Sequence, residues 1–313
     1  MNLKKIKSII LFILFNALLI AALVCMNFIF RNKEYEGAQD KFAKWNPAHA
    51  DIVFIGTSHQ FCSINPDLLY DEYGIESFML ATSAQTVPMS YYAAMEAIEL
   101  KHPDTIVFEI SYVANDFRTL AGMDHCFFDG FPRCNARKEA LDDLVEKDQQ
   151  IYYLLPLGMF HSRWKELDEA DFKDFPLSDR GTFFNAQIFI GAEIPLQDPE
   201  VTEPIPGEME KYLLKMFELC KENNVKLILY AAPFNGLYLY DEYCTQDLLL
   251  RESMFNYTGK LAEENGVEFH NLFYELDAIG INDETDWMDS QHFNCLGQAK
   301  ITRYMMENGY LGR

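Results

Sequence analysis

Basic residues are scarce in this chain of 313 residues. Lys and Arg together number 26, against 48 Asp and Glu, which gives a formal net charge of −22 and an isoelectric point near 4.6. A surface with this excess of negative charge repels a phosphate backbone, so nucleic acid is excluded as a partner. The acidity fits plain solubility, and it also fits attraction to cationic substituents of a cell envelope, such as alanyl esters.

Nucleotide-binding loops are missing as well. Gly56 is followed by Thr-Ser-His-Gln-Phe, without the later glycines of a dinucleotide loop or the Gly-Lys pair of a P-loop. Metal ligands are equally sparse, because Asp124 with His125 and Asp289 with His292 supply only two ligands each, whereas a catalytic zinc takes three. We therefore expect a protein that uses no cofactor and no metal.

Internal repeats and low-complexity tracts are absent, and hydrophobic residues are not in short supply. They make up 49% of the chain, and aromatic residues make up 14%. A chain of this length and composition can bury a sizeable core, which predicts one large domain or one domain with an insertion.

One long apolar run stands near the N-terminus. Residues 9–30 contain only Asn16 and Asn27 as strongly polar members, and at helical rise they are long enough to span a bilayer of about 30 Å. Three lysines among the first seven residues precede the run, which favours a cytoplasmic N-terminus and an extracytoplasmic C-terminal domain.

A cleaved signal peptide is the alternative interpretation of this run. The run exceeds the roughly 7 to 15 apolar residues of a signal peptide and has no Ala-x-Ala exit. Val24 before Cys25 also makes a poor lipoprotein box. We therefore expect a retained signal-anchor and a single-pass protein of the cell membrane.

The rest of the chain alternates between strand and helix patterns. We expect an anchor at 1–31, a juxtamembrane linker at 32–50, and one α/β domain at 51–313 with an insertion at about 114–205 that folds over the carboxyl edge of the sheet. Expected strands are 52–55, 77–81, 105–110, 226–233 and 267–270, and expected helices are 66–73, 90–100, 208–223, 248–264 and 296–307.

Two motifs far apart in the sequence, around Ser58 and His292, carry candidate catalytic residues. Ser58 follows the first buried strand in Gly-Thr-Ser-His, where a helix start would aim free backbone N–H groups at a developing oxyanion. Asp289 lies three residues ahead of His292, close enough for its carboxylate to reach the imidazole and fix its tautomer. Each motif alone is more often a helix cap or surface polarity, but together they predict a Ser-His-Asp triad for acyl transfer. His59 adjoins the nucleophile and is expected to pack or to contact substrate.

This layout resembles the SGNH/GDSL hydrolase superfamily, whose nucleophile follows the first strand and whose Asp-x-x-His precedes the last helix. The Gly-Thr-Ser form and the membrane anchor look most like the branch of surface polysaccharide acyltransferases, which includes alginate-type O-acetyltransferases and the D-alanyl-transfer protein of teichoic acid synthesis. The resemblance covers roughly residues 50 to 310, and its specific motifs are the two end motifs. It implies a three-layer α/β/α fold with a central parallel sheet.

The oxyanion motifs depart from that superfamily. Related hydrolases supply a Gly after the second strand and Gly-x-Asn-Asp after the third, whereas this chain has no such Gly at either place and offers Asn115-Asp116 after a longer spacing. Gln85, Asn115 and Asn235 are our candidates for oxyanion or substrate contact. Gln85 could instead cap a helix, and Asn235 could instead make a turn.

Two further features leave alternatives open. Cys126 with Cys134, and Cys62 with Cys295, could form bridges or stay reduced and buried. Residues 160–164 place a ring nitrogen, a guanidinium and an indole within one helical turn, which suits sugar stacking or an amphipathic helix docked on the core.

The expected function is that of an extracytoplasmic serine acyl-ester hydrolase or O-acyltransferase acting on cell-surface polysaccharide. Its expected partners are an acylated or acceptor glycan, the membrane, and a membrane protein that donates the acyl group. A non-catalytic scaffold or binding protein of envelope polysaccharide assembly, and an esterase of small soluble esters, are the alternatives.

Overall fold

A parallel sheet of five strands forms the centre of the molecule. The computed structural model describes residues 3–30, 38–45, 48–115, 124–131, 134–155, 157–173, 177–237 and 248–312. The strands follow the order β2-β1-β3-β4-β5, and every neighbouring pair is parallel. Their bounds are β1 Ile52–Ile55, β2 Ser77–Met79, β3 Thr105–Glu109, β4 Lys226–Ala231 and β5 Glu268–Asn271.

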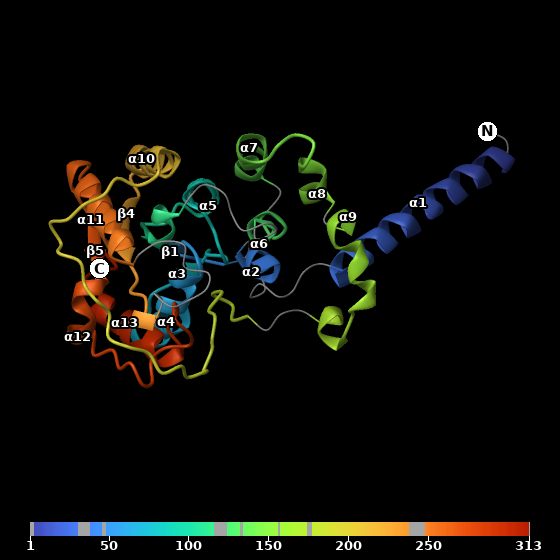
Figure 1. Ribbon diagram of the computed structural model, residues 1–313. Coiled ribbons are helices and arrows are strands. Elements are labelled where there is room, and N and C mark those ends of the chain that lie inside the picture. The colour runs from blue at the N-terminus through green and yellow to red at the C-terminus, as the bar shows by residue number, and fades with distance from the viewer. Residues whose placement is uncertain are drawn as a thin grey trace.

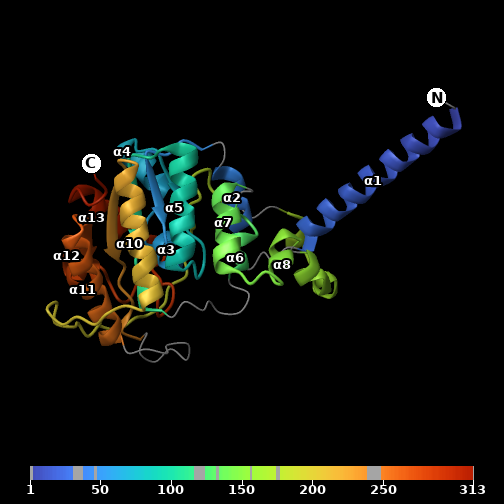
Figure 2. The ribbon, with the colours of Figure 1, turned by 90° about the horizontal axis from the view of Figure 1, so that it is seen from above.

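Helices cover both faces of this sheet, as the sequence predicts. One layer contains α5 (Val87–Lys101), α10 (Gly207–Glu222) and α11 (Leu248–Glu264). The other contains α3 (Ser58–Ser63), α4 (Pro66–Tyr73) and α13 (Cys295–Glu307). The result is the expected three-layer α/β/α architecture (Figure 1, Figure 2). Short pieces η1 (Ser111–Ala114), η5 (Leu272–Glu275) and α12 (Leu276–Ile279) complete this body.

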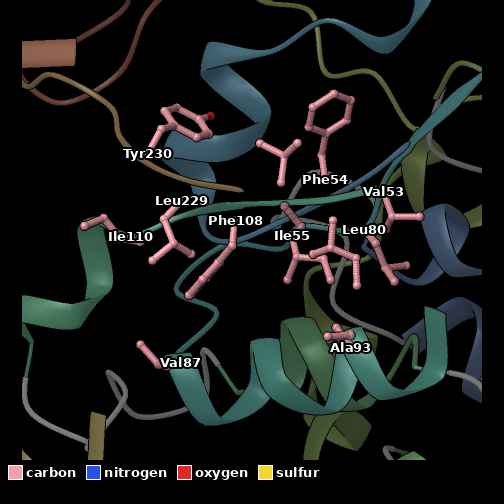
Figure 3. Packing of buried hydrophobic residues seen from close by; sticks show 14 of the residues in the cluster. Val53, Phe54, Ile55, Leu80, Val87, Ala93, Phe108, Ile110, Leu229 and Tyr230 are labelled. Atoms are coloured by element: carbon pink, nitrogen blue, oxygen red, sulfur yellow. The ribbon is translucent and has the colours of Figure 1, made fainter. Parts of the chain in front are cut away.

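The core lies on both faces of the sheet, because helices cover each face. All four residues of β1 are fully buried, which explains why this strand is a continuous apolar run rather than an alternating one. On β4, Leu229 and Tyr230 point to opposite faces, and Val87 and Ala93 of α5 face the sheet from one side (Figure 3). The carboxyl ends of the strands therefore start from a rigid, tightly packed base.

The first helix stands apart from this body. Helix α1 (Leu3–Phe30) projects away from the sheet, and its apolar stretch Lys4–Phe30 is not buried inside the protein (Figure 1). It is long and apolar enough to cross a membrane, in agreement with the predicted anchor.

The predicted linker at 32–50 contains a docked helix, α2 (Ala38–Trp45). Trp45 is fully buried and its ring lies 5.1 Å from that of Phe78 on β2. Lys41 is also buried and donates to the Ala81 carbonyl at 2.7 Å. The described part of this region is thus integrated into the body, because its aromatic side chains complete the core.

The predicted insertion divides into two parts. Its helices lie beside α2, α5 and the end of α1 rather than over the carboxyl edge of the sheet (Figure 1, Figure 2). Among the described residues of the insertion, the extended chain from about residue 180 reaches the strand ends, where Met79 N–H donates to the Arg180 carbonyl at 3.0 Å and Phe189 bridges to Trp287. The pieces of the first part are α6 His125–Phe128, α7 Asn135–Leu144, α8 Gln150–Leu154, α9 Leu157–Phe160, η2 His161–Lys165 and η3 Glu169–Phe172.

Neither of the two candidate disulfides forms. Cys134 is a thiol whose sulfur accepts from the Arg137 N–H at 3.4 Å, and Cys295 is also a thiol. Cys244 lies outside the described residues.

We predict that Gly56 is indispensable at the end of β1. Its φ is +149°, and an added Cβ would lie 3.1 Å from both the Glu109 carbonyl oxygen and the Gln60 Cβ. Gly56→Ala should lower the free energy of unfolding by about 3 kcal/mol. Gly74→Ala is the matched control, because Gly74 has φ +68° with open space around it, and it should cost only about 1 kcal/mol. Chemical denaturation of both variants measures the difference, and equal costs would contradict the packing argument.

Candidate active site

Ser58 is the first residue of α3, immediately after the turn that ends β1. Thr57 caps the helix, and its hydroxyl accepts from the His59 N–H at 3.1 Å. The turn is fixed to the neighbouring loop, since Thr82 N–H donates to the Gly56 carbonyl at 3.3 Å. Ser58 is thereby held at the carboxyl edge of the sheet, where open α/β folds place their sites.

Asp289 and His292 form a compact turn before α13. One Asp289 carboxylate oxygen accepts from the backbone N–H groups of Gln291 and His292 at 2.7 and 2.8 Å. The other oxygen lies 2.9 Å from His292 Nδ1. The carboxylate therefore fixes both the turn and the orientation of the imidazole.

The turn is itself anchored from two sides. The Asn294 side chain caps α13 and donates to the carbonyls of Thr285 and Trp287 at 2.7 and 3.2 Å. From the end of β4, Asn235 N–H donates to the Ser290 carbonyl at 3.1 Å. This bracing determines where the His292 ring can lie.

The two motifs meet. His292 Nε2 lies 2.7 Å from Ser58 Oγ, although 234 residues separate them in the chain. With Nδ1–H donating to Asp289, Nε2 is left as an acceptor for the Ser58 hydroxyl proton. This connectivity is what a serine nucleophile requires for activation by a general base.

The electrostatics of the turn favour an ionised Asp289. Burial alone would raise the pKa of this carboxyl, but its bonds to the His292 ring and to two backbone N–H groups outweigh burial and leave the pKa below its ordinary value. An ionised Asp289 stabilises the imidazolium that forms when His292 takes a proton.

His59 lies beside Ser58 and His292 without bonding to either side chain. Its ring is buried, 4.7 Å from the His292 ring and 4.6 Å from the Phe234 ring. Burial, and then repulsion by His292 and Arg251, hold the pKa of His59 well below its ordinary value, against a hydrogen bond to the Gln291 backbone. His59 is neutral at pH 7, so it adds no second positive charge when His292 is protonated.

The three candidates for oxyanion contact are engaged in other bonds. Gln85 accepts from the Thr82 hydroxyl at 2.9 Å and donates to the Ser90 hydroxyl at 3.2 Å. The Asn115 carbonyl oxygen accepts from Arg251, and Asp116 lies outside the described residues. Gln85 and Asn115 therefore support loops in this structure.

Asn235 has a similar structural role. Its carbonyl oxygen accepts from the N–H groups of Ala192 and Leu237 at 3.0 and 2.9 Å. It thus ties the chain around residue 192 to the end of β4, next to the loop that carries His292. The fully buried Asn235 Nδ2 has no partner among the residues that the structure describes.

A buried carboxyl that sequence reasoning did not single out lies below Ser58. Glu109, at the end of β3, accepts from the Ser111 N–H and hydroxyl, both at 2.8 Å, from Ala232 N–H at 3.3 Å and from the Thr57 hydroxyl at 3.4 Å. It joins β3, β4 and the cap of α3 beneath Ser58. The sequence signal that could have identified Glu109 is a charged residue at the end of the apolar strand β3.

No metal centre emerges from the described part of the chain. No group of three or more His, Cys, Asp and Glu there is placed to hold an ion. Asp124 and His125, one of the two candidate pairs, instead bond within the insertion, where Asp129 lies 2.9 Å from His125 Nδ1.

The likeness to known proteins is found among solved structures and is remote. No family model matches the chain, and no curated protein matches it. Among solved structures, it is similar to a protein of Bacteroides fragilis NCTC 9343 described as a "putative acylhydrolase". The match covers 87% of this chain and 95% of that one, with 11% identity and a TM-score of 0.42.

We predict that Glu109 makes the stability of the protein depend on pH. Burial raises the pKa of Glu109 to about 7 from an ordinary 4.5, against the hydrogen bonds from Ser111, Ala232 and Thr57. The folded state binds this proton more tightly than the unfolded state, so protonation of Glu109 stabilises the fold. This stabilisation is complete below pH 4.5 and is lost as the pH rises through 7.

Glu109→Gln mimics the protonated acid, since its amide can donate to the two hydroxyls. Relative to this variant, the wild type should lose about 3 kcal/mol of unfolding free energy between pH 4.5 and 8. Chemical denaturation in detergent across this range measures it. A constant difference between the two proteins would show that Glu109 keeps its ordinary pKa.

Proposed function

We propose that this protein is an extracytoplasmic serine acyl-ester hydrolase or O-acyltransferase that acts on cell-surface polysaccharide. One observation carries the proposal: the imidazole of His292 bonds Ser58 Oγ through one nitrogen and Asp289 through the other. Ser58 is the nucleophile, His292 the general base and acid, and Asp289 the group that orients and stabilises the imidazolium.

The reaction proceeds in two balanced halves. Ser58 Oγ attacks the acyl carbonyl while its proton moves to His292 Nε2, and the tetrahedral intermediate collapses as His292 returns that proton to the leaving alcohol. In the second half, water or a sugar hydroxyl attacks the acyl-serine and gives its proton to His292. Collapse then frees the acid or the new ester, and His292 reprotonates Ser58.

An oxyanion needs at least one donor close to the attacked carbon. The Ser58 N–H has no hydrogen-bond partner among the residues that the structure describes, and it adjoins the oxygen that becomes bonded to that carbon. It is our candidate donor in place of the superfamily's Gly and Asn. The Gln85 amide already donates to the Ser90 hydroxyl, so any second donor would come from another group or from movement on substrate binding.

The anchor supports a substrate at a membrane surface. Helix α1 and the lysines in its first turns favour a catalytic domain outside the cytoplasm, near envelope glycans and near a membrane protein that supplies acyl groups, acetyl being our first choice. We favour transfer over hydrolysis, since proximity to such a donor benefits a transferase in particular.

We predict that the full chain turns over an activated aryl acetate and that Ser58→Ala lowers kcat/KM about a thousandfold or more. Asp289→Asn should cause a large loss as well, because it no longer fixes the His292 tautomer. Ser162→Ala, an exposed serine of η2, is the control and should leave the rate unchanged. Release of nitrophenolate measures all three.

The same assay tests the alternative of a non-catalytic scaffold, which the Gln85 amide, already bonded to Thr82 and Ser90, favours. Equal, near-background rates for wild type and Ser58→Ala would support the scaffold. If the wild type is active, adding a polysaccharide acceptor should divert acetyl from water to glycan, whereas undiminished hydrolysis would identify an esterase.

A further inference from the structure

Large apolar side chains are exposed along the second half of the insertion. Residues 150–155 and 157–172, which we call the collar, comprise α8, α9, η2 and η3. Apolar surface of this extent on one segment is uncommon on a soluble protein and marks a contact site. Its exposed apolar members are Ile151, Tyr152, Leu154, Leu155, Met159, Trp164 and Phe172.

The collar packs against the end of α1. Leu157 N–H donates to the Asn27 side-chain oxygen at 3.1 Å, and Arg163 donates to the Phe30 carbonyl at 3.1 Å. Both contacts fall within the last turn of the helix, and α9, η2 and η3 all adjoin α1 there (Figure 1). The collar is therefore fixed at a definite height along this helix.

The position of the collar relative to a bilayer follows from the helical rise of α1. If the hydrocarbon core begins near Ile9, after the lysines, a thickness of about 30 Å at about 1.5 Å per residue ends near residue 28. Asn27 and Phe30 then lie at the boundary between acyl chains and headgroups. The residues of the collar that bond them lie at the same level.

A cavity between α1 and α8 supports the placement of the collar at the membrane boundary. It has a volume of about 430 Å³ and joins Ile20, Leu23 and Val24 of α1 to Leu154 and Leu155 of the collar, and its lining also includes Asn27, Asp129 and Arg137. Ile20 is eight residues before the end of the span, so the cavity reaches roughly 12 Å below the boundary. If α1 spans the membrane, the α1 side of the cavity lies at the depth of the acyl chains. The charged groups of the lining are bonded within the protein, Arg137 to the carbonyls of Phe128 and Tyr153 and Asp129 to His125.

The chemistry of the collar fits a lipid surface better than the other interpretations of its 160–164 motif. Trp164 is 62% exposed, so this turn does not dock on the core. Exposed Trp and Tyr are typical of the membrane–water boundary. Between residues 150 and 172 there are two basic and four acidic residues, so burial of apolar surface, and not attraction to anionic lipid, must supply the binding.

We propose that the collar lies in the bilayer, with its apolar side chains in the boundary region of the leaflet that α1 leaves. The proposal goes beyond the catalytic function and rests on α1 spanning the membrane. Together, the anchor and the collar would hold the catalytic domain in one orientation on the membrane surface, whereas a single helix would leave it free to rotate.

Tryptophan quenching tests this with the full chain in phosphatidylcholine bilayers that carry brominated acyl chains. Of the three Trp residues, Trp45 and Trp287 are fully buried and only Trp164 is exposed. Quenching should be substantial in the wild type and should fall at least twofold in Trp164→Phe. Leu154→Asp should reduce the quenching of Trp164, while Leu100→Asp, an exposed leucine on α5, should not.

The anchor is checked separately by adding Phe15→Trp to Trp164→Phe, which reports on α1 alone. Quenching at position 15 without quenching of Trp164 in the wild type would overturn the collar and leave the anchor standing. Absence of quenching at both positions would overturn both. A Trp164 that is shielded from bromine only because the protein self-associates would assign the surface to a second copy and also overturn the proposal.

Discussion

The hydrogen bond between Ser58 Oγ and His292 Nε2 is the contact on which the functional account depends. It exists because two parts of the chain that lie 234 residues apart end at the same edge of a buried sheet. Gly56 lets β1 turn into α3, and Asn294 and Asn235 brace the loop on the other side. A shift of about 1 Å in either support would separate the two atoms beyond bonding distance.

The charges around this bond are arranged to favour proton transfer. Asp289 stays ionised and faces one side of the His292 ring, while the neutral His59 lies against another. Glu109 lies below, joined to the cap of the nucleophile helix rather than to the reacting atoms. A neutral His59 does not repel the positive charge that His292 gains with its proton. Asp289 therefore stabilises that charge without opposition from His59.

Much of this was predictable from the sequence, and the limits have physical causes. The apolar run of β1 and the caps around Pro66 and Gly74 are local signals, so the strand and helix bounds agree closely with the structure. The meeting of Ser58 with His292 followed from chain order at a parallel sheet edge. The placement of the insertion and the docking of α2 did not, because they depend on nonlocal packing such as Trp45 against Phe78. Hydrogen-bond competition for Gln85 and Asn115 is likewise invisible in a sequence.

The central claim is that Ser58 is a nucleophile activated by His292. Site mapping by mass spectrometry after treatment of the full chain with a fluorophosphonate tests it most directly. We predict one phosphonyl adduct, on the peptide that contains Ser58, and its loss in a folded His292→Ala variant. An adduct on a different residue, or no adduct on a protein shown to be folded, would contradict it.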